Sequence, residues 1–262
     1  MNINVDNFII GASLFGMGAA VAAPERSFAA ESGGLIGGEF INAFCERGVC
    51  PDEPETEFGR TYKNIMRERG IMSANGYIHS GAAMYALCDM ICRYGADMLL
   101  YTRVIGCERE GNGGYKITLF NSEGYSYAYA KRVVDTREEE YIRRFGAKGV
   151  KKYLNAAVSP INGADGGKAA VYNPQSGIYT YVFEADINES IIDARERFYE
   201  NWLKGGNGTQ DYSLTLLSNA FAYRFEAPVI REGENGIIYA PSSSFANILD
   251  AFDEGAKFGG AL

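Results

Sequence analysis

The residues best suited to binding chemistry stand near the start of the chain, in the run GASLFG at residues 11–16. Gly11 suits a tight turn out of a strand, and Gly16 lets a following helix pack closely on that strand. The first amides of such a helix bind phosphate groups, since they carry partial positive charge. Glu31 stands twenty residues after Gly11, where a carboxylate accepts hydrogen bonds from an adenosine ribose. The pattern therefore predicts a dinucleotide site.

A strand, a turn and a helix must position these residues. The apolar run ending at residues 7–10 predicts a strand, the small residues 16–23 predict a helix, and residues 26–31 predict a second strand that ends in an acid. Pro24 and Glu25 end the helix. A βαβ unit therefore occupies the first thirty-one residues.

A glycine pair six residues beyond Glu31 strengthens the pattern, whereas Ser13 departs from it, because a third glycine usually stands there. The alternative is that these glycines only pack a turn between strand and helix. The cofactor-binding residues predicted in this part of the chain are Gly11, Ser13, Leu14, Phe15, Gly16, Glu31, Ser32, Gly37 and Gly38.

The remainder of the chain predicts an α/β fold with a small added lobe. Helices are expected at 57–69 and 81–94, the second ended by Gly95. A buried strand is expected at 97–101. Three further strands at 104–110, 115–120 and 125–129 are joined by short turns as an antiparallel meander, and a last strand at 131–135 returns to the parallel sheet.

The lobe is predicted to span residues 140–228, with the nucleotide-binding domain formed by 1–139 and 229–262. Within the lobe we expect a turn at 163–168, an aromatic strand at 178–186 and a helix at 189–203. The Tyr-rich stretch 172–183 could line a substrate pocket, although packing in the core suits it better. The charged run REEEYIRRF before it is typical of a solvated helix face. After Gly236 a short strand, a serine run and a helix at 246–259 close the chain.

Charge and hydropathy exclude some partners. The net charge of −8 argues against nucleic acid, which is bound by clustered Lys and Arg. The N-terminal apolar run is broken by glycines and lacks a preceding basic residue, which fits neither a secretory signal nor a membrane span. We therefore expect a soluble cytoplasmic protein that acts on a small molecule.

The cysteines and the single histidine predict no metal site, because the five cysteines form no CxxC pair. Cys88 and Cys92 are interpreted as small packing residues rather than a redox pair. Cys45 and Cys50 follow the glycine pair and could exchange disulfides, although their spacing matches no known redox motif. His79 could carry protons, although a surface or helix-capping position suits it better.

The runs IIGASLFGMGAA and FAAESGGLIGGEF resemble the N-terminal motif of FAD-dependent oxidoreductases of the glutathione-reductase-like class, which have two dinucleotide-binding domains. The resemblance implies a Rossmann-like FAD/NAD(P)-binding domain with a parallel sheet, an antiparallel β-meander crossover and FAD as cofactor. It also implies that Val104 meets the adenine through its backbone. Ser243 and Ser244, before the terminal helix, would lie near the flavin.

Two departures from that class bear on activity. Thr136-Arg137-Glu138-Glu139 replaces its usual Ala-Thr-Gly-Asp run, which puts bulk and charge where the backbone usually approaches the cofactor. The chain is also short for the class, so its substrate domain is expected to be reduced or absent. The leading prediction is an FAD-binding oxidoreductase with no assigned proton donor. The alternatives are a thiazole-synthase-like enzyme that binds a nicotinamide dinucleotide, and a non-catalytic nucleotide-binding descendant.

Overall fold

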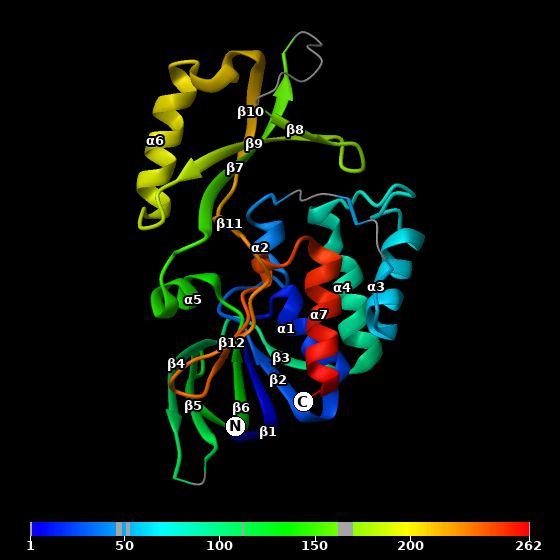
Figure 1. Ribbon diagram of the computed structural model, residues 1–262, viewed down its shortest axis with the longest axis vertical. Helices are drawn as coiled ribbons and strands as arrows, with labels where there is room; N and C mark the ends of the chain where they lie inside the picture. The colour runs from blue at the N-terminus through cyan, green and yellow to red at the C-terminus, as the bar shows by residue number, and fades with distance from the viewer. Residues whose placement is uncertain (1, 46–48, 51–52, 112, 162–169, 262) are drawn as a thin grey trace.

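The computed structural model describes residues 2–45, 49–50, 53–111, 113–161 and 170–261, and these form two β-sheets. Figure 1 shows one sheet near the N-terminus, flanked by helices, and the other at the opposite end of the molecule. The turn predicted at 163–168 lies outside the described residues. Among the described residues, every helix is too short or too polar to cross a lipid bilayer.

The first sheet has a parallel core, as the sequence predicted. The strands of this core, in the order in which they lie side by side, are β13 (Ile238–Tyr239), β6 (Gly124–Asp135), β1 (Asn2–Ile10), β2 (Ser27–Ala30) and β3 (Asp97–Leu99). All four contacts between them are parallel, and β12 (Arg231–Glu232) adds an antiparallel edge. The α/β, Rossmann-like fold class is thereby confirmed.

The register of this sheet brings three chain segments to one edge. Ile10, the last residue of β1, is level with the last residues of both β2 and β6. Gly11, Glu31 and Thr136 therefore leave the sheet side by side. The Thr136 N–H donates to the Ile10 carbonyl over 2.9 Å, which continues the ladder one step past the strand ends. In open α/β sheets, ligands bind at this carboxyl edge, where the strand order reverses.

The meander is formed by β4 (Arg103–Arg109), β5 (Tyr115–Asn121) and β6, with antiparallel pairing throughout. The predicted separation of strands 125–129 and 131–135 is wrong, because both belong to the single strand β6. No turn-forming residue interrupts the segment, and β6 pairs with β1 from Tyr127 to Asp135. One continuous strand thus joins the meander to the parallel core.

Helices α1 (Leu14–Ala22), α4 (Ser80–Tyr94) and α7 (Ile248–Ala261) lie on one side of the parallel core in Figure 1, and α3 (Glu57–Glu68) packs against them. Each was predicted within a few residues of its observed bounds. Gly95 ends α4 in the left-handed conformation, with φ of 70°, as expected for a C-cap. Short helices η1 (Pro24–Arg26), α2 (Gly38–Ile41) and η3 (Ser242–Ser244) occupy the connections.

Glycines let α1 and α7 pack backbone against backbone. A Cβ added at Gly255 would collide with the Phe15 carbonyl, and one added at Gly259 would collide with the Ala19 carbonyl. Gly18 meets the Phe252 carbonyl in the same way. Since α7 is held this close, η3, which precedes it, reaches the first turn of α1.

The second sheet follows α5 (Glu138–Phe145) and has five strands. They are β7 (Val150–Pro160), β8 (Ala170–Asn173), β9 (Ile178–Ala185), β10 (Tyr212–Leu217) and β11 (Ala222–Phe225). The helix α6 (Ile191–Leu203), within the range predicted at 189–203, packs Phe198 against Tyr181 and Phe183 of β9. A short helix, η2 (Gly206–Asp211), precedes β10. The Tyr-rich stretch 172–183 spans β8 and β9, and its Tyr181 and Phe183 are core residues, whereas Tyr172 on β8 is 48% exposed.

The contact between α1 and α7 predicts that one methyl group at Gly255 is costly. We expect Gly255→Ala to lower the free energy of unfolding by about 1–3 kcal/mol, because the backbone of Phe15 cannot give way. Gly260→Ala, in the same helix but with open space around it, should be neutral or stabilising by up to about 1 kcal/mol. Urea unfolding measures both, and equal midpoints for the two variants would contradict the assignment.

Candidate dinucleotide site

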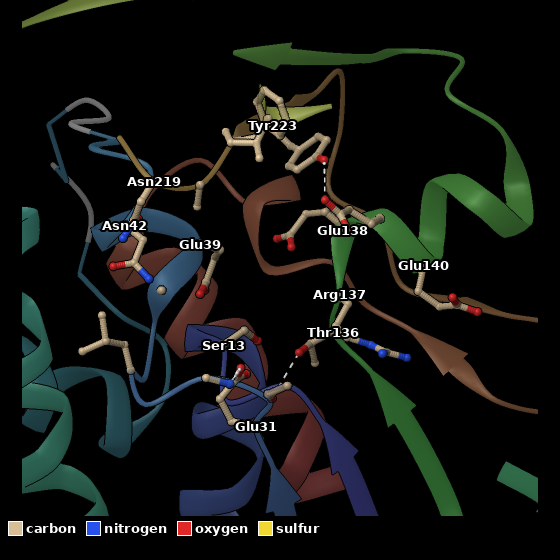
Figure 2. Close-up of a pocket in the computed structure, with 18 of the residues that line it drawn as sticks. Ser13, Glu31, Glu39, Asn42, Thr136, Arg137, Glu138, Glu140, Asn219 and Tyr223 are labelled. Atoms are coloured by element: carbon tan, nitrogen blue, oxygen red, sulfur yellow. Dashed lines mark hydrogen bonds between the residues drawn. The ribbon is translucent and has the colours of Figure 1, made fainter. Parts of the chain in front are cut away.

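A cavity of about 770 Å³ lies at the carboxyl edge of the parallel sheet and extends to the second sheet. In Figure 2, Ser13 and Glu31 lie at one end of it, and Tyr223 and Asn219 lie at the other. Its volume falls in the range of small-molecule and cofactor sites. The predicted site residues Gly11, Ser13, Glu31 and Gly38 all line it.

The two glycines of the GASLFG run have the roles that their spacing predicted. Gly11 has φ of +96°, and a Cβ there would lie 2.7 Å from Thr136 Oγ1. A Cβ at Gly16 would lie 2.7 Å from the Gly11 carbonyl oxygen and 3.0 Å from Ile9 Cγ2. A side chain at either position would therefore force the turn or the helix away from β1.

Glu31 points toward this turn. Its Oε2 accepts the Ala12 N–H over 3.0 Å, and its Oε1 accepts the Gly33 N–H over 2.7 Å. Ser32 is exposed and donates its hydroxyl to the same carboxylate. Each carboxylate oxygen can accept further hydrogen bonds, so Glu31 can still bind a hydroxyl group in the cavity.

The amides at the start of α1 already have partners from the chain itself. Ser13 caps the helix by accepting the Gly16 N–H over 3.1 Å. The Leu14 N–H donates to Glu39 Oε1 over 2.8 Å, and the Phe15 N–H donates to Ser242 Oγ over 3.1 Å. A carboxylate thus lies where the helix end would attract a phosphate.

A second carboxylate is held in the same way. Glu138, the first residue of α5, accepts the Ser243 N–H through Oε1 over 3.1 Å. Burial and the charge of Glu138 raise the pKa of the Glu39 carboxyl to about 7, and burial raises the pKa of Glu138 too. The interpretation of REEEYIRRF as a wholly solvated face is therefore wrong for Glu138, because the chain turns inward at the start of α5.

The cavity contains more acid than base. Six glutamates and three basic residues line it. Arg137 donates to Asp135 from Nε and Nη2, over 2.9 and 2.6 Å, and points away from Glu39 in Figure 2. Lys152 donates to two backbone carbonyls, and burial lowers its pKa. Arg143 pairs with Glu140.

Of the other predicted residues, Gly37 is bonded to the turn, whereas Val104 and Ser244 lie away from the cavity. Gly37 has φ of 66° at the start of α2 and donates its N–H to the Ala12 carbonyl over 2.8 Å, which ties the glycine pair to the turn. Val104, on β4, and Ser244 do not line the 770 Å³ cavity. Ser244 instead borders a separate cavity of about 430 Å³ and accepts the Val229 N–H.

The cysteines and His79 lie apart from the cavity lining. Burial raises the pKa of the Cys50 thiol to about 12, which disfavours the thiolate that disulfide exchange requires. His79 stands at the N-cap position of α4 without a capping hydrogen bond from its side chain. Within the described residues, no cluster of His, Cys, Asp and Glu could hold a metal ion.

Sequence reasoning missed Glu39, Ser242 and Tyr223, and it noted Glu138 only as part of the bulky, charged run 136–139. An acid directly after the Gly37-Gly38 pair was the one local signal, because the predicted loop already faced the phosphates. Tyr223, from β11, donates its hydroxyl to Glu139 over 3.3 Å, and no local pattern indicates that contact. The pairing of β11 with β7 creates it.

No family model and no curated protein matches the chain. Solved structures do match, over nearly its whole length. A flavoprotein/dehydrogenase from Cytophaga hutchinsonii is 13% identical with a TM-score of 0.60, and the alignment covers 98% of this chain and 77% of that one. A geranylgeranyl bacteriochlorophyll reductase-like protein from Thermoplasma acidophilum is 12% identical with a TM-score of 0.62, covering 99% and 78%.

The glycerol-3-phosphate dehydrogenase from Bacillus halodurans, solved in complex with FAD, is 12% identical with a TM-score of 0.59, and the alignment covers 98% of this chain and 64% of that one. Such identities establish the fold and leave the activity open. The chain has the fold of the FAD-dependent flavoprotein oxidoreductases.

Proposed function

We propose that this chain is an FAD-binding oxidoreductase that acts on a small molecule. The observation that carries the proposal is the position of Glu31, whose carboxylate faces the Gly11 turn at the end of a cavity of about 770 Å³. The fold shared with an FAD complex supports the same cofactor. FAD would supply the hydride or electron transfer, and the protein would bind and orient it.

The residues fit the adenosine half of FAD directly. Glu31 would accept the ribose hydroxyls, and Gly11 leaves the turn free of a side chain. The residues fit the diphosphate only if the Glu39 carboxylate moves off the Leu14 N–H. A single N–H cannot make a good hydrogen bond to the carboxylate and to a phosphate at once.

Tyr223 and Lys152, near the cavity, are poorly placed to act as bases. Burial raises the pKa of Tyr223, which is also bonded to Glu139, so its hydroxyl stays protonated at neutral pH. Lys152 is held by the carbonyls of Ile187 and Glu189. We therefore assign to this chain binding and orientation of the cofactor, and proton transfer to neither Tyr223 nor Lys152.

A second candidate, a non-catalytic descendant of the flavoprotein fold, is favoured by the carboxylates on the Leu14 and Ser243 amides. No observation favours a thiazole-synthase-like enzyme over FAD, since the matching structures include a flavoprotein and an FAD complex.

The visible spectrum of the purified protein separates these candidates. We expect the absorption bands of oxidised flavin after incubation with FAD and gel filtration, because the cavity and Glu31 retain the cofactor. Bleaching by a reductant, followed by recovery in air, would show that the bound flavin is redox-active. A protein that stays colourless after FAD loading would favour the non-catalytic descendant.

Glu31 provides the matched mutational test. Glu31→Ala removes the carboxylate and should weaken FAD binding by about tenfold to a hundredfold, the size expected for hydrogen bonds to a charged group. Glu25→Ala removes an exposed acid of the same βαβ unit, on η1, and serves as the control. Equal FAD affinities for the two variants, measured by flavin fluorescence titration, would remove the basis of the proposed site.

A further inference from the structure

The helix end that should attract the diphosphate already carries a negative group. Glu39 reaches the Leu14 amide from α2, a different element, and is only partly buried. Its side chain therefore closes the phosphate position from the cavity side. A carboxylate at a helix N-terminus is favourable in itself, which explains why the pair forms in the absence of another anion.

Glu138, on α5, reinforces this arrangement at the same cavity. It holds the Ser243 amide, and its charge interacts with that of Glu39. Ser242, next in the chain to Ser243, caps the Phe15 amide. The two glutamates thus cover neighbouring amides of α1 and η3, and both contacts come from groups that would repel a diphosphate.

Few positive groups offset these charges. Lys152 and Arg137 are bonded elsewhere, as described above. The other charged or titratable groups that share the cavity or interact with Glu39 are Glu31 after β2, Tyr62 on α3, Glu139, Glu140 and Arg143 on α5, Glu189 before α6 and Tyr223 on β11. Arg143 is paired with Glu140, so acids dominate the surroundings of Glu39.

We propose that Glu39 and Glu138 are internal anions that compete with the dinucleotide diphosphate for these amides and so set the affinity of the site. FAD binding then requires Glu39 to leave the Leu14 amide, and its carboxyl leaves more easily once it has taken up a proton. This inference rests on the proposed function for its ligand, but its test distinguishes a failure of the competition from a failure of the proposed function.

The sign of the pH dependence follows from the raised pKa of Glu39. The carboxyl is neutral below about pH 7 and ionised above it. Ionised Glu39 holds the amide and repels phosphate, so FAD affinity should fall as pH rises from about 6 to about 8, by at most about tenfold per pH unit for one proton. The phosphates of FAD carry constant charge over this range, so the change belongs to the protein.

The test measures binding of FAD, ADP and adenosine at about pH 6 and about pH 8 by isothermal titration calorimetry. The proteins are the wild type, Glu39→Gln, Glu138→Gln and the double variant. We expect Glu39→Gln to tighten FAD and ADP binding by about tenfold or more at the higher pH, since it removes one repelling charge. The affinity of this variant for FAD should depend much less on pH, whereas ADP, whose terminal phosphate titrates in the same range, is compared between variants at one pH only. Adenosine, which has no phosphate, should respond to none of the changes.

Glu68→Gln is the control, because Glu68 is an exposed acid on α3 that lies outside the cavity lining. It should change FAD affinity by less than about threefold, because the charge of an exposed side chain away from the site is screened by solvent and salt. Urea unfolding checks that each variant folds. Glu39→Gln keeps the shape and removes an acid that burial disfavours, so its stability above about pH 7 should match or exceed that of the wild type.

The outcomes separate the two proposals. If FAD binds only after Glu39 and Glu138 are neutralised, the competition is supported, and the wild-type chain is not an FAD enzyme. If the wild type binds FAD equally well at both pH values and the variants leave its affinity unchanged, the competition is overturned and the proposed function stands. If neither the wild type nor the double variant binds FAD or ADP, both proposals fall.

Discussion

The register between β1 and its two parallel neighbours is the constraint on which the rest of the site depends. Because Ile10 is level with the last residues of β2 and β6, the turn at Gly11, the carboxylate of Glu31 and the hydroxyl of Thr136 must meet at one edge. A slip of one residue in either pairing would turn Glu31 or Thr136 to the other face of the sheet. The tight contact between α1 and α7 then fixes η3 against the same edge.

The groups at this edge favour anions through the backbone and oppose them through the side chains. The first turn of α1 offers amides with partial positive charge, yet Glu39 and Ser242 take two of them. Natural phosphate sites leave such amides free or add a basic side chain. Here the nearby bases are bonded elsewhere, so the affinity for a diphosphate depends on whether Glu39 is ionised.

Much of the fold could be predicted from the sequence, because its signals are local. The turn after β1, the helices α3, α4 and α7 and the meander follow from periodicity and from glycine positions. The boundary inside β6 was missed, since a long strand that pairs with two neighbours has no local mark at the point where its partner changes. The run 136–139 was expected to bring charge near the cofactor, but the contact of Glu138 with the Ser243 amide was not predicted. The inward direction of Glu138 depends on how α5 leaves the sheet, and a charged helical run looks solvated from spacing alone.

The most direct test of this account is a crystal structure of the protein grown with FAD below about pH 6, where Glu39 is neutral. We expect phosphate oxygens within hydrogen-bond distance of the Leu14 amide, the Glu39 carboxyl displaced from it, and Glu31 on the ribose. FAD bound with Glu39 still on the Leu14 amide, or with its ribose away from Glu31, would contradict the account.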